Sequence, residues 1–312
     1  MTPLDLLVLG DANPDLVLAG GDVVPAFGQA EHVVDEARLV VGGSGAIIAC
    51  GAARLGLDVA LVAVVGDDPL GALMRSELEA RGVDTAGLVV DPSLPTGLSV
   101  VLSGERDRAI LTHVGAIAAL RLDLVDTDLL ASARHVHVSS YFLHPGLVPD
   151  LPGLFARLRA DGTTTSVDPN WDPSETWDAQ LLDLLADTDV FLPNEVEATR
   201  LARTSSIDDA ARGLAERAGI VVVKRGAECA LACVGESIME APAVPTTVVD
   251  TTGAGDSFDA GFLVGWLADR PLADALRLAS ACGSASTRAL GGVAAQPTME
   301  EAEALLSTGS PA

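Results

Sequence analysis

Short runs of β-branched and other apolar residues alternate with longer amphipathic stretches along most of this 312-residue chain. Glycines and polar turns separate the two kinds of segment, and apolar residues recur at helical spacing in the longer ones. Parallel strands need long crossover connections, so this alternation is typical of a mostly parallel sheet with helices on both faces. The sequence therefore predicts an α/β fold, with strands at 4–9, 59–65, 136–139, 164–167, 190–192 and 220–223.

Two regions, at about 11–41 and 96–114, break this rhythm. The second region, TGLSVVLSGERDRAILTHV, has the pattern of two strands around a turn at 104–107. The two regions could form a small sheet that projects from the main body, or could be a pair of surface hairpins. We expect a single domain over 1–312, because 49% of the residues are hydrophobic and can fill one large core.

The chain is strongly acidic, since 44 acidic residues against 19 basic residues give a formal charge of -25. Its summed field repels phosphate backbones and anionic membranes, so we expect no nucleic acid and no membrane as partner. The longest apolar stretches, such as 58–65, are too short to span a bilayer, and the first residues lack a signal-peptide pattern. The chain is expected to be soluble and cytoplasmic.

Motifs of several other protein classes are missing from the sequence. The four cysteines form no C-x-x-C pair, which suggests neither a disulfide framework nor a zinc site. No G-x-x-x-x-G-K-S/T loop occurs, and the segment that starts at Gly43 has isoleucine where the dinucleotide fingerprint needs its third glycine. His135 and His137 share one face of an expected strand, and we expect them to have a structural role.

The segment DTTGAGDSFDAGF, which starts at Asp250, carries the strongest chemical signal. It follows a β-branched strand end and continues into apolar residues at helical spacing, so it predicts a strand, a glycine loop and a helix. Gly253 and Gly255 permit a tight turn and leave N–H groups unobstructed at the start of the helix, where the dipole favours negative charge. The segment therefore predicts an anion-binding site.

Asp256 lies beside this predicted anion site, in the first helical turn. It could simply cap the helix, a role that contributes about 1 kcal/mol to stability. A carboxylate next to backbone N–H donors is also what phosphoryl transfer to an alcohol requires, since one group must take the hydroxyl proton while donors stabilise the transferred oxygens. We therefore favour Asp256 as a general base.

Motifs along nearly the whole chain resemble the PfkB, or ribokinase-like, family of carbohydrate kinases. DTTGAGDSFDAGF resembles the second signature of the family and GGSGAIIACGAARLG resembles the first. The other matching segments are VLGDANPD, VGDDPLG, RGVDT, VDPNW, PNEVE and VVKRGAE. The resemblance implies a ribokinase-like three-layer α/β/α sandwich with a mostly parallel central sheet and a small β-sheet lid, which fits the two irregular regions.

The resemblance also implies roles for individual residues. Asp256 would be the general base and would contact the substrate, and Gly253, Ala254 and Gly255 would form the anion hole that receives the nucleotide phosphate. Asp15, Gly42 and Gly43 would contact sugar hydroxyls, because the carboxylate accepts hydrogen bonds and the glycines allow close backbone approach.

The nucleotide side is implied by two further motifs. Asn194 and Glu197 match an N-x-x-E motif associated with nucleotide phosphate and with Mg²⁺ held through water, although an ordinary helix start after Pro193 would give the same pattern. Lys224 and Gly226 match a nucleotide-binding strand end. The basic residues are 18 arginines and this one lysine, so Lys224 is an uncommon choice at its position.

A monovalent cation, K⁺, often lies beside the anion hole in this family. The resemblance would place Asp250 and the Thr252 carbonyl near it, with Ser286 and Gly291 as further contributors. Two other positions depart from the family pattern. Ile47 replaces a usual asparagine and is expected to offer apolar surface to the substrate, and Ser44 replaces the lysine of several members that act on phosphorylated sugars.

Together these features predict an ATP-dependent kinase that phosphorylates a hydroxyl of a small sugar or sugar-like substrate, with ATP and Mg²⁺ and with K⁺ as a hypothesis. The open alternatives are a nucleoside kinase on the same fold and a non-catalytic sugar or nucleotide sensor. Lid strands could also pair between two subunits in a homodimer, because exposed strand edges need covering.

Overall fold

The structure, a computed structural model, describes residues 4–21, 23–104, 108–177 and 179–308. A 9-stranded central sheet has the spatial order β13-β12-β11-β10-β9-β8-β1-β4-β5. Neighbouring strands from β5 to β11 are parallel, whereas β12 and β13 pair antiparallel at one edge. The strands are β1 (Leu4–Leu9), β4 (Val59–Gly66), β5 (Leu88–Asp91), β8 (Ala133–Val138), β9 (Thr164–Val167), β10 (Val190–Phe191), β11 (Ile220–Lys224), β12 (Cys229–Val234) and β13 (Ser237–Pro242). The predicted α/β fold class is confirmed.

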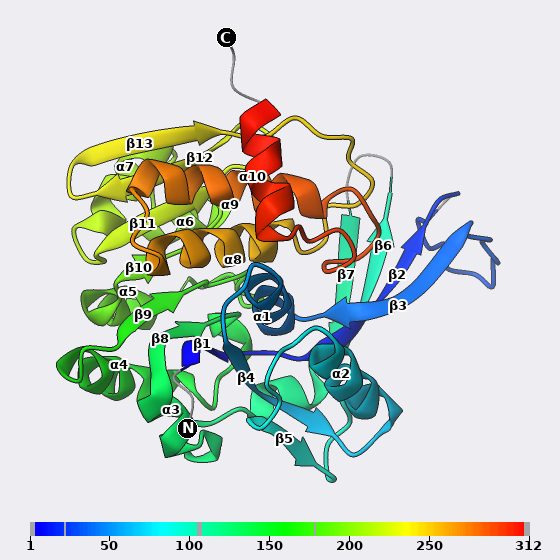
Figure 1. Ribbon diagram of the computed structural model, residues 1–312. Helices are drawn as coiled ribbons and strands as arrows, with labels where there is room; N and C mark the ends of the chain where they lie inside the picture. Colours follow the sequence, from blue (N-terminus) through cyan, green and yellow to red (C-terminus); the bar gives the residue numbers. More distant parts are fainter. Residues whose placement is uncertain (1–3, 22, 105–107, 178, 309–312) are drawn as a thin grey trace.

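Helices cover both faces of the central sheet and complete the three layers (Figure 1). One face packs against α1 (Ser44–Arg54), α2 (Pro69–Ala80), α8 (Ala254–Leu267), α9 (Leu272–Ser286) and α10 (Met299–Thr308). The other face packs against α3 (Thr127–Ser132), α4 (Leu151–Ala160), α5 (Ala179–Leu184), α6 (Glu195–Ala202) and α7 (Ile207–Ala215). Within the described residues, no helix combines the length and apolar character needed to cross a membrane.

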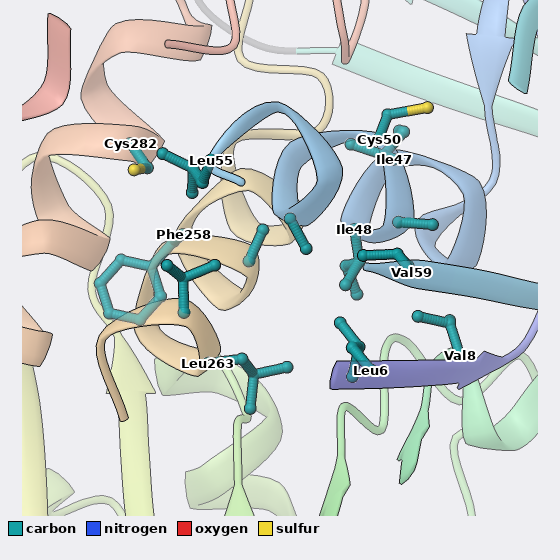
Figure 2. Close-up of a cluster of buried hydrophobic side chains, with 14 of the residues drawn as sticks. Leu6, Val8, Ile47, Ile48, Cys50, Leu55, Val59, Phe258, Leu263 and Cys282 are labelled. Carbon is teal, nitrogen blue, oxygen red and sulfur yellow. The ribbon is translucent and has the colours of Figure 1, made fainter. Parts of the chain in front are cut away.

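Strand β1 shows how one sequence supplies both cores. Leu6 and Val8 belong to the core under α1 and α8, whereas Leu7 and Leu9 belong to the core on the opposite face. This division follows from strand geometry, because successive side chains point to opposite sides of a sheet. Figure 2 shows Leu6 and Val8 facing the side chains of α1 and α8, among them Ile48.

A separate 4-stranded sheet, in the order β3-β2-β6-β7, stands out from one side of the molecule (Figure 1). Its strands are β2 (Asn13–Ala19), β3 (Glu36–Gly42), β6 (Leu98–Ser103) and β7 (Arg108–His113). Because β2 and β6 pair in parallel, the two irregular regions form one small sheet and not two independent hairpins. Val17 and Val101 of this sheet pack against Leu290 of the main body. Residues 105–107 of the turn expected between β6 and β7 lie outside the described residues.

The strand order reverses at β1, since the chain continues to β4 and β5 on one side and builds β8 to β11 on the other. In open α/β sheets, ligands bind beyond the carboxyl ends of the strands at such a reversal. Here β1 leads to Asp11, β8 to Ser140, β9 to Asp168 and β10 to Asn194, while β11 ends at Lys224. The topology therefore gathers polar residues at one edge of the sheet.

We expect Phe155→Ala to destabilise the protein strongly, because Phe155 of α4 is fully buried in the core away from this edge. Loss of a buried phenylalanine side chain costs about 3–5 kcal/mol of unfolding free energy. The control is Phe27→Ala, since Phe27 is fully exposed and its truncation should change the free energy by less than about 0.5 kcal/mol. Urea unfolding followed by circular dichroism measures both, and equal stability of the two variants would contradict the described core.

Candidate active site

The predicted anion site is a tight backbone junction at the start of α8. Gly253 precedes the helix in the left-handed conformation, with φ of 69°, and no side chain caps this end. A methyl group added to Gly253 would lie 2.6 Å from the Cα atom of Gly292, so the close approach also requires glycine. The N–H groups of Gly255 and Asp256 donate to no acceptor among the described residues. These unpaired donors and the helix dipole favour an anion in front of the loop.

Ile47 supports this junction from α1. Its Cγ2 atom would lie 3.1 Å from a methyl group added to Gly253, and its side chain belongs to the main core. Ile47 is only 2% exposed, so the expectation that it offers apolar surface to the substrate is wrong. The branched side chain instead fills the space behind the anion loop, where the close packing of Gly253 and Gly292 needs an apolar neighbour.

Asp256 is partly exposed in the first turn of α8 and does not cap the helix, since Gly253 holds the N-cap position without a side-chain hydrogen bond. Its carboxyl group accepts a hydrogen bond from the Ser44 hydroxyl, and Ser44 Oγ accepts one from Asn170 Nδ2 at 2.9 Å. Burial and the nearby Asp168 charge raise the pKa of Asp256 to about 7, against the opposing effect of Lys224. Such a carboxyl group can exchange a proton near neutral pH.

Asp15, Gly42 and Gly43 meet where the small sheet joins the main body. A methyl group added to Gly42 would lie 2.1 Å from the Asp15 carboxyl carbon, and one added to Gly43 would lie 2.9 Å from Asn13 Oδ1. Burial, and repulsion from the Asp11 and Asp256 charges, raise the pKa of Asp15 to about 7. The structure therefore brings Asp15 and Asp256 close enough for their charges to interact, as a substrate held by both would require.

Several polar residues of this region were given no role from the sequence. Asp11 accepts hydrogen bonds from the backbone N–H groups of Ser44 at 3.2 Å and Gly45 at 2.9 Å, and from the Ser140 hydroxyl at 3.1 Å. It thereby holds the start of α1, where the helix dipole favours a carboxylate. Asn170 Nδ2 donates to the Ser44 and Ser140 hydroxyls. Asp11 lies in VLGDANPD and Asn170 in VDPNW, so both belong to motifs that match the family. The sequence alone does not show which residues they hydrogen-bond to, so it gave them no function.

Asn194 and Glu197 form a reciprocal capping box at the start of α6. Glu197 Oε2 accepts from the Asn194 backbone N–H at 2.8 Å, and Asn194 Oδ1 accepts from the Glu197 N–H at 2.9 Å. Glu197 Oε1 accepts a further hydrogen bond from Asn194 Nδ2. Burial raises the pKa of Glu197 to about 7, with a further contribution from Asp168. The helix-start alternative is therefore realised, while a role toward nucleotide or Mg²⁺ stays a prediction.

Lys224 ends β11 next to Asn194, and its side chain turns into the protein. Its Nζ atom donates to Asp259 Oδ2 at 2.8 Å and to Asp168 Oδ2 at 3.1 Å. Although burial alone lowers a lysine pKa, the carboxylates around Lys224 raise its pKa above the ordinary value. Gly226 follows with φ of 57° and no atom within 4 Å of an added methyl group, so it leaves open space at this strand end.

Asp250 ties the start of the glycine loop to a later turn. One carboxylate oxygen accepts from the Thr252 backbone N–H at 3.0 Å and hydroxyl at 2.9 Å, and the other accepts from the Gly291 N–H at 2.9 Å. Gly291 is thus adjacent to Asp250, whereas Ser286 donates to the Gly283 carbonyl. The part of the chain that the structure describes contains no cluster of three or more histidine, cysteine, aspartate or glutamate residues that could hold a metal ion.

Known proteins share this sequence and architecture. The model of the pfkB family carbohydrate kinases matches residues 4–299. The ATP-dependent ribose-1-phosphate kinase of Halopiger xanaduensis is 32% identical over 97% of this chain and 98% of that protein. The fructokinase of Klebsiella pneumoniae is 34% identical over 94% and 96%, respectively. The structure of Arabidopsis thaliana ribokinase complexed with ribose and ATP has a TM-score of 0.83 at 25% identity, covering 98% of this chain and 99% of that chain. The chain therefore belongs to the PfkB family of carbohydrate kinases.

Proposed function

We propose that this protein transfers the γ-phosphoryl group of ATP to a hydroxyl of a small sugar or sugar-like substrate, with Asp256 as the general base. The observation that carries this proposal is the position of Asp256, a partly exposed carboxyl group at a helix start whose N–H groups have no acceptor among the described residues. Proton acceptor and anion donors thus converge on one place, as in-line transfer requires.

In the proposed reaction, the Asp256 carboxylate takes the proton of the acceptor hydroxyl as its oxygen forms a bond to the γ-phosphorus. The bond from that phosphorus to the bridging oxygen breaks, and ADP leaves. Ser44 orients the Asp256 carboxyl group through its hydrogen bond, and Asn170 in turn holds Ser44. The unpaired N–H groups of Gly255 and Asp256 stabilise the charge that develops on the transferred oxygens, whereas the Ala254 N–H already donates to the Thr251 carbonyl at 3.2 Å.

We place the sugar between Asp15, Gly42, Gly43 and the small sheet, and ATP across the strand ends near Asn194 and Gly226. The small sheet would exclude water from the reaction as a lid. Glu197 would hold Mg²⁺ through water, and its donor set suits a hard cation, because each carboxylate oxygen keeps a lone pair beyond its bond from Asn194. When bound, Mg²⁺ supplies positive charge against the nucleotide phosphates.

The acceptor itself belongs to the family's range of small polyols. The relatives are named for ribose 1-phosphate, fructose, 2-dehydro-3-deoxygluconate and nucleosides. Ser44 in place of a lysine, with Asp11 and Asp15 nearby, supports a neutral acceptor over a phosphorylated one. A coupled ADP-release screen across these compounds and ribose identifies the substrate, and binding without turnover would favour the sensor alternative.

We expect Asp256→Asn to reduce kcat by about 10²–10⁴-fold, because the amide cannot accept the hydroxyl proton. The fold should persist, since the carboxyl group makes no helix-cap hydrogen bond. ADP release measures turnover and circular dichroism checks the fold. Asp161→Asn, an exposed change at the end of α4, is the matched control and should keep full activity. Near-normal kcat in Asp256→Asn would remove Asp256 from the proposed role.

Gly42→Ala should impair acceptor binding, since the new methyl group collides with the Asp15 carboxyl group and displaces it. We expect the KM for the acceptor to rise at least about tenfold, the loss of one charged hydrogen bond, while the KM for ATP stays within about twofold. Gly153→Ala on α4 is the control, because nothing lies within 4 Å of its added methyl group. Equal increases in both KM values would argue against Asp15 as a sugar contact.

K⁺ is proposed to bind at Asp250 and the Thr252 carbonyl, where a buried carboxylate at 3% exposure gives negative charge beside the anion loop. Replacing K⁺ by tetramethylammonium at constant ionic strength should lower kcat several-fold, because the larger cation cannot enter. Asp250→Asn should abolish the difference between the two salts. Identical activity of the native protein in both salts would refute the cation site and leave Asp256 untouched.

A further inference from the structure

Lys224 is the member of the site whose surroundings differ most from the sequence expectation. Its side chain is 11% exposed, and its ammonium group is held between the carboxyl groups of Asp168 and Asp259, which are 6% and 0% exposed. Two of its three N–H donors are used by these partners. To reach a nucleotide phosphate outside, the ammonium group would have to leave a buried ion pair, and breaking such a pair costs about 3–5 kcal/mol.

The two carboxyl groups also interact with each other. Burial raises the pKa of Asp168, but the Lys224 charge and then the hydrogen bond with Asp259 outweigh it and lower that pKa. Burial is the largest influence that raises the pKa of Asp259, and the nearby Asp168 adds to it. Asp259 Oδ1 is buried without a hydrogen-bond partner among the described residues, which suits a neutral carboxyl group better than a carboxylate. Lys224 and Asp168 therefore form a buried ion pair, and Asp259 accepts a second hydrogen bond from the ammonium group in surroundings that favour its neutral form.

This ion pair lies directly beside the anion loop. A methyl group added to Gly255 would lie 3.6 Å from Cδ, 3.8 Å from Cε and 3.9 Å from Nζ of Lys224, so the lysine side chain passes beside the loop with room for one methyl group between them. Asp259 is also one helical turn from Asp256 on α8, and Asp168 follows β9 at the same edge. The cluster of Lys224, Asp168 and Asp259 therefore connects the sheet to the helix that carries the proposed base.

The charged groups that act on Asp256 come from several elements. Four carboxyl groups repel a negative charge on Asp256, and the positive charge of Lys224 opposes this repulsion. These negative groups are Asp11 after β1, Asp15 of β2, Asp168 after β9 and Glu197 of α6.

We propose that Lys224, clamped by Asp168 and Asp259, is a positioning residue that sets the pH range of phosphoryl transfer by keeping positive charge beside Gly255 and Asp256, without contacting ATP. The inference rests on the proposed role of Asp256 as base. It assigns the single lysine of the chain to the base and the anion loop, in place of the nucleotide-phosphate contact that its motif suggested.

The test is the pH dependence of kcat in three variants. Activity should rise through about pH 7 in the native protein, because Asp256 must be deprotonated to accept the proton. Lys224→Met removes the opposing positive charge, so the pH at which activity rises should increase by about one to two units. Asp168→Asn removes a negative charge, so the pH at which activity rises should decrease. The double variant removes both charges together and should return close to the native profile.

The KM values separate the alternatives. In Lys224→Met, the KM for ATP should stay within twofold of the native value, and Lys224→Arg should restore the native pH profile because it restores the charge. A tenfold rise in that KM with an unmoved pH profile would overturn the proposal in favour of a phosphate contact. A lower Tm with an unmoved profile would overturn it in favour of a purely structural ion pair.

One control variant and one fallback complete the design. Arg212→Met removes one partly exposed positive charge on α7 and should leave the pH profile unchanged. If Lys224→Met does not fold, Asp168→Asn and the double variant decide the question, because an unmoved profile in Asp168→Asn contradicts the inference by itself. Failure of the proposed function appears differently, as full activity of Asp256→Asn.

Discussion

Carboxyl groups crowd the carboxyl edge of the central sheet, and the site depends on how each of them is neutralised. Asp11 is satisfied by the backbone N–H groups at the start of α1, and Glu197 by the capping box with Asn194. Asp168 has Lys224 and the Asn170 N–H. Burial nevertheless raises the pKa values of Glu197, Asp15 and Asp256 to about 7. Two of these three carboxyl groups, Asp15 and Asp256, are the ones assigned to the substrate.

Close backbone packing is the second requirement of the site. Gly253 approaches Gly292 with Ile47 behind it, and Gly42 leaves room for the Asp15 carboxyl group. None of these contacts tolerates an additional methyl group without movement. A carbohydrate kinase of this acidity thus creates its positive potential from backbone N–H groups and one buried lysine, which is consistent with a formal charge of -25.

The sequence predicted those features that depend on local pattern. The alternation of strand and helix segments predicted the parallel sheet, and the glycines of DTTGAGD predicted a tight loop before a helix, both of which the structure contains. It was less informative where a side chain has two environments to choose from. Ile47 could face the substrate or the core, and Lys224 could face solvent or Asp259. These choices depend on partners far away in the chain, so no local pattern of residues encodes them.

The antiparallel strands β12 and β13 and the hydrogen bonds of Asp11 illustrate the same limit. Strand pairing at the edge of the sheet, and capping of a helix by a residue 33 positions earlier, are tertiary contacts that form only in the folded chain. The motifs VLGDANPD and VDPNW marked Asp11 and Asn170 as part of the family pattern, but only the folded chain shows that both converge on Ser44.

The connections of the small sheet have a mechanical consequence. Strand β2 starts two residues after Asp11, and β3 ends at Gly42, two residues before Ser44. The two strands that carry the proposed sugar contacts are therefore joined closely to Asp11, which holds the start of α1, and to Ser44, which hydrogen-bonds to Asp256. A tilt of the small sheet onto a sugar would pull on Ser44 as well, so substrate capture and alignment of the base would be a single coupled movement.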